Sequence, residues 1–187
     1  QVREVRRGTR RSGAPRPRQE YPEKVVSVLD REGMVPAIYF LFSRKKCDEA
    51  ARRSDQAVTL SAEHRQALSS AIDDALRENP SLEEHSHLAH LRQGVAAHHA
   101  GLLPAWKALV ENLFQQGLLQ VVYATETLAA GINMPARTTV ISAISKYSDD
   151  GHRMLTASEF LQMSGRAGRR GMDTLGHVVV VHHPLEP

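Results

Sequence analysis

The chain is organised by compact apolar runs in which polar residues do not alternate with apolar ones. These runs are rich in β-branched and aromatic side chains, and they cover residues 37–42, 120–124, 139–144 and 177–181. A strand that is apolar on both faces is typical of a parallel sheet covered by helices on both sides. We therefore predict four such strands, with residues 95–98 as a candidate for a shorter fifth.

Helical patterns fall between these runs. The clearest begins at Pro104 and ends at Gly117, with apolar side chains at helical spacing between them. A second helix is predicted over residues 44–53, directly after the first strand. The alternation of strands and helices predicts an α/β domain with a doubly wound parallel sheet.

Residues 61–92 depart from this alternation and are interpreted as a helical insertion. One helix is expected over residues 61–78 and a second over 82–92. The second prediction depends on Ser81-Leu82-Glu83-Glu84, which has the residue types of a capping box at a helix start.

Length and charge indicate one domain preceded by a basic arm. The chain has 187 residues, of which 41% are apolar, enough for one substantial core. Its net charge of +3 is uneven, because residues 1–18 hold seven arginines and Glu4, a balance of +6, so the remainder sums to −3. We expect a disordered basic linker over 1–20, with loose nucleic-acid binding as the alternative, and a folded domain over 21–187.

Cysteine content and hydropathy bear on the compartment. Cys47 is the only cysteine, which excludes an internal disulfide and fits a reducing compartment. We expect it to be a small core residue rather than a nucleophile. No apolar run approaches the length of a membrane span, and no signal peptide is visible. A cytoplasmic location is expected, with plastid or nucleus as alternatives, and the start at Gln1 indicates a piece of a longer protein.

The strongest chemical signal lies at residues 162–171, where three arginines stand among three glycines. Glycine allows close approach of the backbone to a ligand, and guanidinium forks fit phosphate oxygens. Residues 156–159 have the pattern of a capping box, so a helix is expected to run into this segment. On that helix Gln162, Arg166 and Arg169 would share one face. The segment predicts a polyphosphate site; the alternative is a solvated basic helix end.

Polar motifs also follow three of the predicted strands. Ser43-Arg44 comes after the first strand, His98–Pro104 after the short one and Thr125–Pro135 after the next. Ligands of open parallel sheets bind at the carboxyl ends of the strands, and hydroxyls, amides and basic side chains there suit phosphate recognition. For Ser43 and Thr125, a helix-capping role is an equal alternative.

Together these motifs resemble the C-terminal motor motifs of superfamily-two DExH-box RNA helicases. Residues 98–104, 124–137 and 162–173 carry the resemblance, and Ser43-Arg44 is similar to the motif that opens the second RecA-like domain of that family. The superkiller-type, exosome-associated branch, with its bacterial and plastid relatives, is the most similar. The resemblance covers residues 35–183, and it implies a RecA-like, P-loop NTPase-type C-terminal helicase domain with a helical insertion.

The resemblance also implies roles for individual residues. Gln162, Arg166 and Arg169 would be catalytic, with both arginines reaching the phosphates of ATP across a cleft. If these two arginines pointed away from the open rim and were locked to carboxylates of their own domain, the motor interpretation would fail. The resemblance places further ATP contacts at Gly131 and Asn133, nucleic-acid contacts at Ser43, Arg44, His99, Gly101 and Thr125, and coupling of the two surfaces at Glu126.

The sequence contains no Gly-x-x-x-x-Gly-Lys-Ser/Thr loop and no Asp-Glu-x-His box. The resemblance therefore implies that ATP and its Mg²⁺ are held by an upstream RecA-like domain, and this piece alone is expected not to hydrolyse ATP. Single-stranded RNA, contacted through its backbone, is the expected partner. RNA-decay machinery is a further partner that the family implies, and no membrane partner is expected.

Several alternatives stay open. A DNA helicase of the same superfamily is one, although DNA-repair relatives often carry proline where this chain has Arg170. A RecA-like RNA-binding module without ATPase activity is another, and a kinase would need a phosphate loop of its own. No metal site is expected, because His85, His87 and His90 on one helix would point in different directions.

Overall fold

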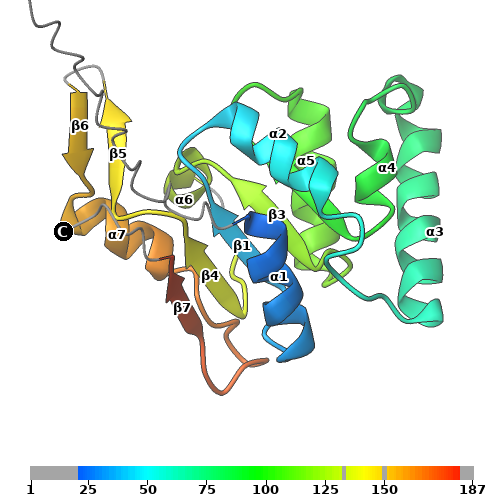
Figure 1. Ribbon diagram of the computed structural model, residues 1–187. Coiled ribbons are helices and arrows are strands. Elements are labelled where there is room, and N and C mark those ends of the chain that lie inside the picture. Colours follow the sequence, from blue (N-terminus) through cyan, green and yellow to red (C-terminus); the bar gives the residue numbers. More distant parts are fainter. Residues whose placement is uncertain (1–20, 132–133, 149–150, 182–187) are drawn as a thin grey trace, which may run out of the picture.

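A sheet of five parallel strands forms the centre of the molecule (Figure 1). The computed structural model describes residues 21–131, 134–148 and 151–181. In spatial order the strands are β2 (Val95–His98), β3 (Val121–Ala124), β1 (Ala37–Phe40), β4 (Thr138–Ile141) and β7 (His177–Val180). Each predicted apolar run, including the short one, overlaps one of these strands. The strand order with its crossovers confirms the predicted doubly wound α/β fold.

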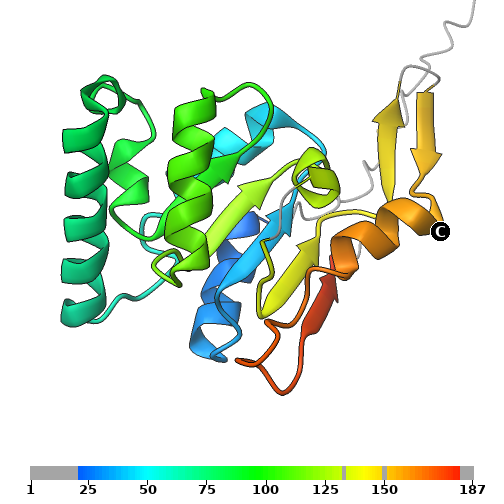
Figure 2. The ribbon, with the colours of Figure 1, turned by 180° about the vertical axis from the view of Figure 1, so that it is seen from behind.

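Helices cover both faces of the sheet, as Figures 1 and 2 show from opposite sides. Side chains of successive strand residues point to opposite faces. Ala37 and Tyr39 therefore join one apolar cluster, and Ile38 and Phe40 join the other. The first cluster lies under α1 (Pro22–Arg31) and α2 (Arg44–Arg53); the second lies under α3 (Ala62–Glu78), α5 (Pro104–Gln115), α6 (Thr127–Gly131) and α7 (Ala157–Ser164).

Large side chains fill both clusters. Trp106 of α5 is fully buried in one of them. In the other, the Tyr39 and Tyr123 ring centroids lie 5.5 Å apart, and the Tyr123 hydroxyl shares a 2.6 Å hydrogen bond with Ser54 Oγ. Burial of one large apolar side chain contributes about 1.5–3 kcal/mol to folding. The clusters on the two faces therefore hold the strands between the helices. In the described residues, no helix has both the length and the apolar character needed to span a membrane.

The helical insertion differs from its prediction in the second half. α3 forms as expected, and the Ser61 hydroxyl caps it by accepting a hydrogen bond from the His64 amide at 3.1 Å. The predicted helix over 82–92 is wrong. A short 3₁₀ turn (Pro80–Leu82) is followed by turns and by the single-turn α4 (Leu88–Leu91). Ser81 is not a cap, because its hydroxyl donates to Asn79 Oδ1 within the 3₁₀ turn.

A two-stranded antiparallel hairpin follows β4 and was not predicted. It comprises β5 (Ser145–Ser148) and β6 (Gly151–Met154). Figure 1 shows the hairpin standing apart from the main sheet, beside the start of α7. The predicted strand over 139–144 therefore ends early, at Ile141, and the chain turns into this separate element. α1 was likewise not predicted.

Candidate functional site

The carboxyl ends of β1, β2 and β3 bring three predicted ligand segments to one edge of the sheet. Phe40 and His98, the last residues of β1 and β2, are both in register with Ala124, the last residue of β3. Hydrogen bonds continue across this edge, since the Thr125 amide donates to the His98 carbonyl at 3.3 Å. The segments that follow these strands therefore lie side by side, as their sequence positions predicted.

Ser43 and Arg44 form the start of α2. The Ser43 hydroxyl accepts a hydrogen bond from the Lys46 amide at 3.4 Å, so the serine has the capping role left open above. Arg44, Lys45 and Lys46 are exposed at this end. A helix N-terminus carries unpaired amides and favours anions, so three cations there disfavour the isolated helix and concentrate positive charge at one point. This arrangement suits a phosphate ligand.

His99 lies inside the turn that follows β2 instead of on its surface. Its side chain is only 5% exposed. Nδ1 accepts a hydrogen bond from the Gly101 amide at 3.1 Å, so Nε2 carries the proton and donates to Asp48 Oδ1 at 2.9 Å. Direct contact of this ring with a nucleic acid does not fit the structure. The ring instead fixes the turn to α2.

Gly101 places this turn directly beside Arg44. A Cβ atom at Gly101 would lie 3.1 Å from His99 Nδ1 and 3.5 Å from Arg44 Cδ. The space is therefore already filled by side chains that belong to two predicted ligand segments. A ligand at this point would meet the backbone of the turn and the exposed Arg44 side chain.

Thr125 and Glu126 follow β3. Thr125 is 9% exposed, and its hydroxyl shares a 2.9 Å hydrogen bond with the Thr127 hydroxyl at the start of α6. Glu126 is more exposed and forms an ion pair with Lys146 of β5, with 2.7 Å between Nζ and Oε1. The loop is thus attached to the hairpin through the residue expected to couple the two surfaces.

Lys146 belongs to a network of four charges. Its ammonium group also contacts Glu159 Oε1 at 2.9 Å, and Arg153 binds both oxygens of that carboxylate at 2.7 and 2.9 Å. Burial opposes the charge of Lys146, but its hydrogen bonds to both glutamates outweigh this and raise its pKa. Hydrogen bonds from Arg153, Lys146 and the Thr156 amide hold the pKa of Glu159 far below its usual value.

The arginine segment is a turn, and the predicted helical face shared by its residues is wrong. α7 ends at Ser164, so Gln162 lies on the helix whereas Arg166 and Arg169 lie beyond it. Gly165 caps the helix, and Gly168 has a φ of +90°, which reverses the chain. A helical wheel does not apply past such a cap.

The turn is wedged beside the amino end of β4. The Ala136 amide donates to the Arg166 carbonyl at 2.9 Å, and the Gly168 amide donates to the Ala136 carbonyl at 2.7 Å. The closeness of the backbones requires glycine at position 176, where a Cβ atom would lie 2.5 Å from both the Ala167 carbonyl carbon and the Gly168 nitrogen. This turn is therefore held rigidly by backbone contacts.

The two arginines of the turn have partners within their own domain. Arg169 binds Asp173 through Nε at 2.8 Å and through one terminal nitrogen at 2.9 Å, and the Asp173 side chain is fully buried. Arg137 also binds this carboxylate, at 3.1 Å. These hydrogen bonds, the one from Arg169 above all, hold the pKa of Asp173 far below its usual value. Arg166 donates to the Ala129 carbonyl, whereas Gln162 is exposed.

Of the two arginines, Arg169 is therefore locked to a carboxylate of its own domain, whereas Arg166 donates to a backbone carbonyl. Asp173 takes the side edge of the guanidinium group, formed by Nε and one terminal nitrogen. The other terminal nitrogen makes no hydrogen bond with any residue that the structure describes, so the end of the fork keeps donors for a ligand. Two arginines share one carboxylate here, and the cluster has net positive charge.

The resemblance also implied ATP contacts at Gly131 and Asn133. Gly131 ends α6, next to the segment that Arg166 contacts. Asn133 lies outside the described residues.

The histidines of the insertion come together, contrary to the argument from a single helix. The His85 ring stacks on Trp106 at 3.8 Å between centroids, and His87 lies 5.1 Å from His85 and 4.9 Å from His90. These rings come together because residues 83–87 do not form a helix. In the described part of the chain, no three His, Cys, Asp or Glu side chains are arranged to hold a metal ion.

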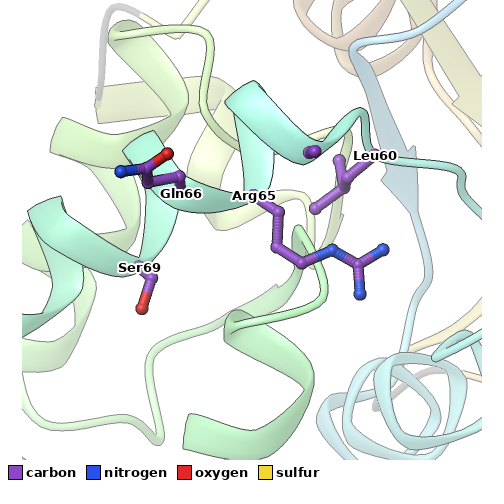
Figure 3. Close-up of a pocket in the computed structure, with 5 residues that line it drawn as sticks. Leu60, Arg65, Gln66 and Ser69 are labelled. Carbon is purple, nitrogen blue, oxygen red and sulfur yellow. The ribbon is translucent and has the colours of Figure 1, made fainter.

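A pocket lies away from both candidate sites, at the start of α3. Figure 3 shows it, and none of its lining residues was predicted to bind a ligand: Leu60, Ala62, Arg65, Gln66 and Ser69.

Sequence reasoning missed the residues that position the predicted ones. Asp173 is close to Arg169 in the sequence, at the end of the arginine motif, and an acidic residue there could have been considered as its partner. Asp48 and Lys146 carry no local signal, because their partners are far away in the sequence.

Comparisons with known proteins identify the family of the chain. The family described as the helicase conserved C-terminal domain matches residues 69–171. The chain is 47% identical over 191 residues to the probable helicase HelY of Mycobacterium tuberculosis strain H37Rv, covering 97% of this chain and 21% of that protein. It is 45% identical over 158 residues to the chloroplastic DExH-box ATP-dependent RNA helicase DExH15 of Arabidopsis thaliana, covering 84% of this chain and 14% of the relative.

A yeast protein extends the comparison. The chain is 37% identical over 171 residues to the antiviral helicase SKI2 of Saccharomyces cerevisiae, covering 88% of this chain and 13% of that protein. The chain thus spans about a fifth or less of the length of these relatives.

Proposed function

The chain belongs to the family of conserved C-terminal helicase domains, and from this premise we propose that it is the second motor domain of an ATP-dependent RNA helicase. In this proposal it supplies arginines to ATP and backbone contacts to single-stranded RNA. The observation that carries the proposal is the pairing of two built regions on one domain. One is a cationic sheet edge at Ser43, Arg44 and Gly101, and the other is the rigid turn with Arg166 and Arg169.

The arginine turn would act on ATP held by a neighbouring domain. Phosphoryl transfer requires little covalent work from protein, so stabilisation of charge on the phosphate oxygens dominates catalysis. Arg166 and Arg169 would supply that charge, and the exposed Gln162 amide would position the attacking water. Gly131 and Asn133 would add contacts to the nucleotide. Mg²⁺ would be held by the neighbouring domain along with the phosphates.

Asp173 gives this role a specific geometry. An unheld arginine side chain loses rotamer entropy when it binds phosphate, whereas the Asp173 carboxylate already fixes Arg169. The end of the fork would then meet the phosphate while the side edge stays on Asp173. The pair therefore places Arg169 in advance of domain closure.

The sheet edge would hold the RNA strand through its phosphates. Arg44 and the two lysines after it would provide charge, and the exposed backbone at Ala100 and Gly101 would add polar contacts. Thr125 is nearly buried, so its contact would come through the backbone of its loop. The Arabidopsis relative is named an RNA helicase, which favours RNA over DNA. RNA-decay machinery would be a further partner of the whole protein, in a cytoplasmic or plastid setting.

One observation favours a second candidate, a RecA-like RNA-binding module without ATPase activity. Arg169 is paired with a carboxylate of its own domain, as it would be if its role were only structural. The two candidates differ in one consequence: a module needs the sheet edge alone, whereas a motor needs the arginine turn as well.

The test uses the protein that contains this chain together with its ATP-binding domain. Arg169→Ala is expected to remove nearly all RNA-stimulated ATP hydrolysis, on the order of 10³-fold or more, with RNA affinity unchanged. Arg65→Ala is the matched control, because Arg65 is an exposed arginine outside both regions. Hydrolysis that survives Arg169→Ala would support the binding module. The chain alone is expected to hydrolyse no ATP.

A further inference from the structure

Lys146 is placed between two carboxylates that belong to different functional segments. Its side chain is 10% exposed, and its ammonium group lies 2.7 Å from Glu126 and 2.9 Å from Glu159. The Phe42 ring, which follows β1, lies under the same ammonium group at 5.9 Å. One cation in the hairpin thus contacts the segments that follow β1 and β3 and the first turn of α7.

The two carboxylates connect to the two regions described above. Glu126 directly follows Thr125, in the loop at the sheet edge. Glu159 is the third residue of α7 and belongs to its capping box, where it accepts from the Thr156 amide at 2.8 Å. α7 has eight residues and so is about 12 Å long, and it leads straight into the arginine turn. Lys146 therefore bridges the loop at one region and the helix that carries the other.

α7 does not depend on Lys146 for its own structure. Arg153 binds both oxygens of Glu159, and the capping box is completed by Thr156. Glu126 is different: within the described residues, Lys146 is the only ion-pair partner of its side chain. Removal of the ammonium group would release the loop while leaving α7 capped. Loss of the ammonium group should therefore disconnect the loop from α7 without unfolding the helix, which is the effect of a connecting residue and not of a purely structural one.

We propose that Lys146 is a positioning residue that transmits RNA binding at the Thr125–Glu126 loop to the arginine turn through Glu159 and α7. This inference rests on the proposed motor function. The ammonium group holds the loop at a fixed distance from α7, so the loop, the helix and the rigid arginine turn shift as one unit relative to the neighbouring domain when RNA binds. Without this ammonium group, RNA would still bind, but its binding would no longer affect the position of the arginines.

The experiment measures ATP hydrolysis by the protein that contains this chain and its ATP-binding domain, with and without saturating RNA. Lys146→Met is expected to lower the ratio of the two rates by about tenfold, within the usual range of coupling between sites, with RNA affinity unchanged. Lys146→Arg keeps a cation that can reach two carboxylates and is expected to restore most of the ratio. Arg153→Met is the matched control in the same network, and it is expected to leave the ratio within about twofold.

A double-mutant cycle separates coupling from general damage. Glu126→Gln should lower the ratio as Lys146→Met does, and the two substitutions together should lower it no further, because both cut the same link. An unchanged ratio in Lys146→Met, an equal loss in Arg153→Met, or additive losses in the cycle would overturn the inference. If Lys146→Met does not fold, Glu126→Gln and Lys146→Arg carry the test. Absence of RNA-stimulated hydrolysis in the unsubstituted protein would instead reject the motor function.

Discussion

The sheet edge and the arginine turn reach a defined geometry by different routes. The edge is assembled from three segments far apart in the sequence, which the register of β1, β2 and β3 brings together. The turn is one continuous segment, shaped by Gly168 and wedged against Ala136. The first therefore depends on the whole fold, and the second on a few local contacts. Substitutions should damage them in correspondingly different ways.

Both regions nonetheless share one feature. In each, a carboxylate fixes the side chain of a residue that was expected to meet the ligand. Asp48 fixes His99, and Asp173 fixes Arg169. Exposed neighbours, Arg44 at the edge and Gln162 before the turn, complete each region. At both places, a carboxylate fixes one residue, and a neighbouring side chain is exposed to solvent.

After loss of the arginines themselves, the largest effect is expected from loss of the carboxylate behind the turn. Asp173→Asn keeps the shape of the side chain but removes the charge that fixes Arg169, and misplacement of a catalytic group by about 1 Å lowers rates about 10²-fold. RNA-stimulated ATP hydrolysis of the protein with its ATP-binding domain should fall by that order, with RNA affinity unchanged. Asp55→Asn, at an exposed aspartate, is the control. A rate equal to the control would mean that Asp173 does not position Arg169.

The next effect concerns the stability of the wedge. Gly176→Ala puts a Cβ atom 2.5 Å from backbone atoms of the turn, and overpacking of this kind costs about 1–3 kcal/mol. Urea unfolding of this chain measures the loss. Gly33→Ala is the comparison, because it has a φ of +66° but open space around it; it should destabilise by about 1 kcal/mol through backbone strain alone. Equal losses in the two variants would argue against a wedged turn.

Acidification should destabilise the fold through His90 of the insertion. Burial, with a smaller contribution from His87, lowers the pKa of His90 to about 4 from 6.5. Because the folded state favours the neutral ring, the stabilisation is present above pH 6.5 and is lost as the pH falls toward 4. Thermal midpoints of this chain between these pH values should decline, and His90→Leu should flatten the decline. An identical slope in the variant would contradict the assignment to His90.

The smallest effect is expected at the sheet edge. Arg44→Ala should weaken RNA binding by a few-fold and reduce the slope of affinity against salt by about one, as loss of one phosphate contact does. Fluorescence titration at several salt concentrations measures both quantities. Arg53→Ala is the matched control, at the other end of the same helix. If Arg53→Ala changes the salt slope equally, the cations at the start of α2 are not a specific phosphate site.

The sequence predicts the architecture well because the central strands carry their own signal. Apolar runs without alternation are typical of strands in a covered parallel sheet, and every such run overlaps a strand. α3 and α5 were equally readable from Ser61 and Pro104. The predicted helix at 82–92 failed because a local capping pattern competed with packing of His85 on Trp106, a contact between distant residues.

The candidate sites were predicted as segments but not as side-chain orientations. Motif and strand positions placed Ser43, the His99 turn and Thr125 correctly at one edge. Which side chain faces outward depends on partners elsewhere in the chain, such as Asp48 for His99 and Lys146 for Glu126. Helical spacing was extended past Gly165, where the helix ends, so the arrangement of the two arginines was wrong.

The most direct test replaces both Arg166 and Arg169 with alanine in the protein that also contains the ATP-binding domain. Two quantities are measured together, the rate of ATP hydrolysis at saturating RNA and the affinity for single-stranded RNA. The proposed motor role predicts a loss in rate on the order of 10³-fold or more with affinity unchanged. A near-normal rate, or an affinity that falls in step with the rate, would contradict it.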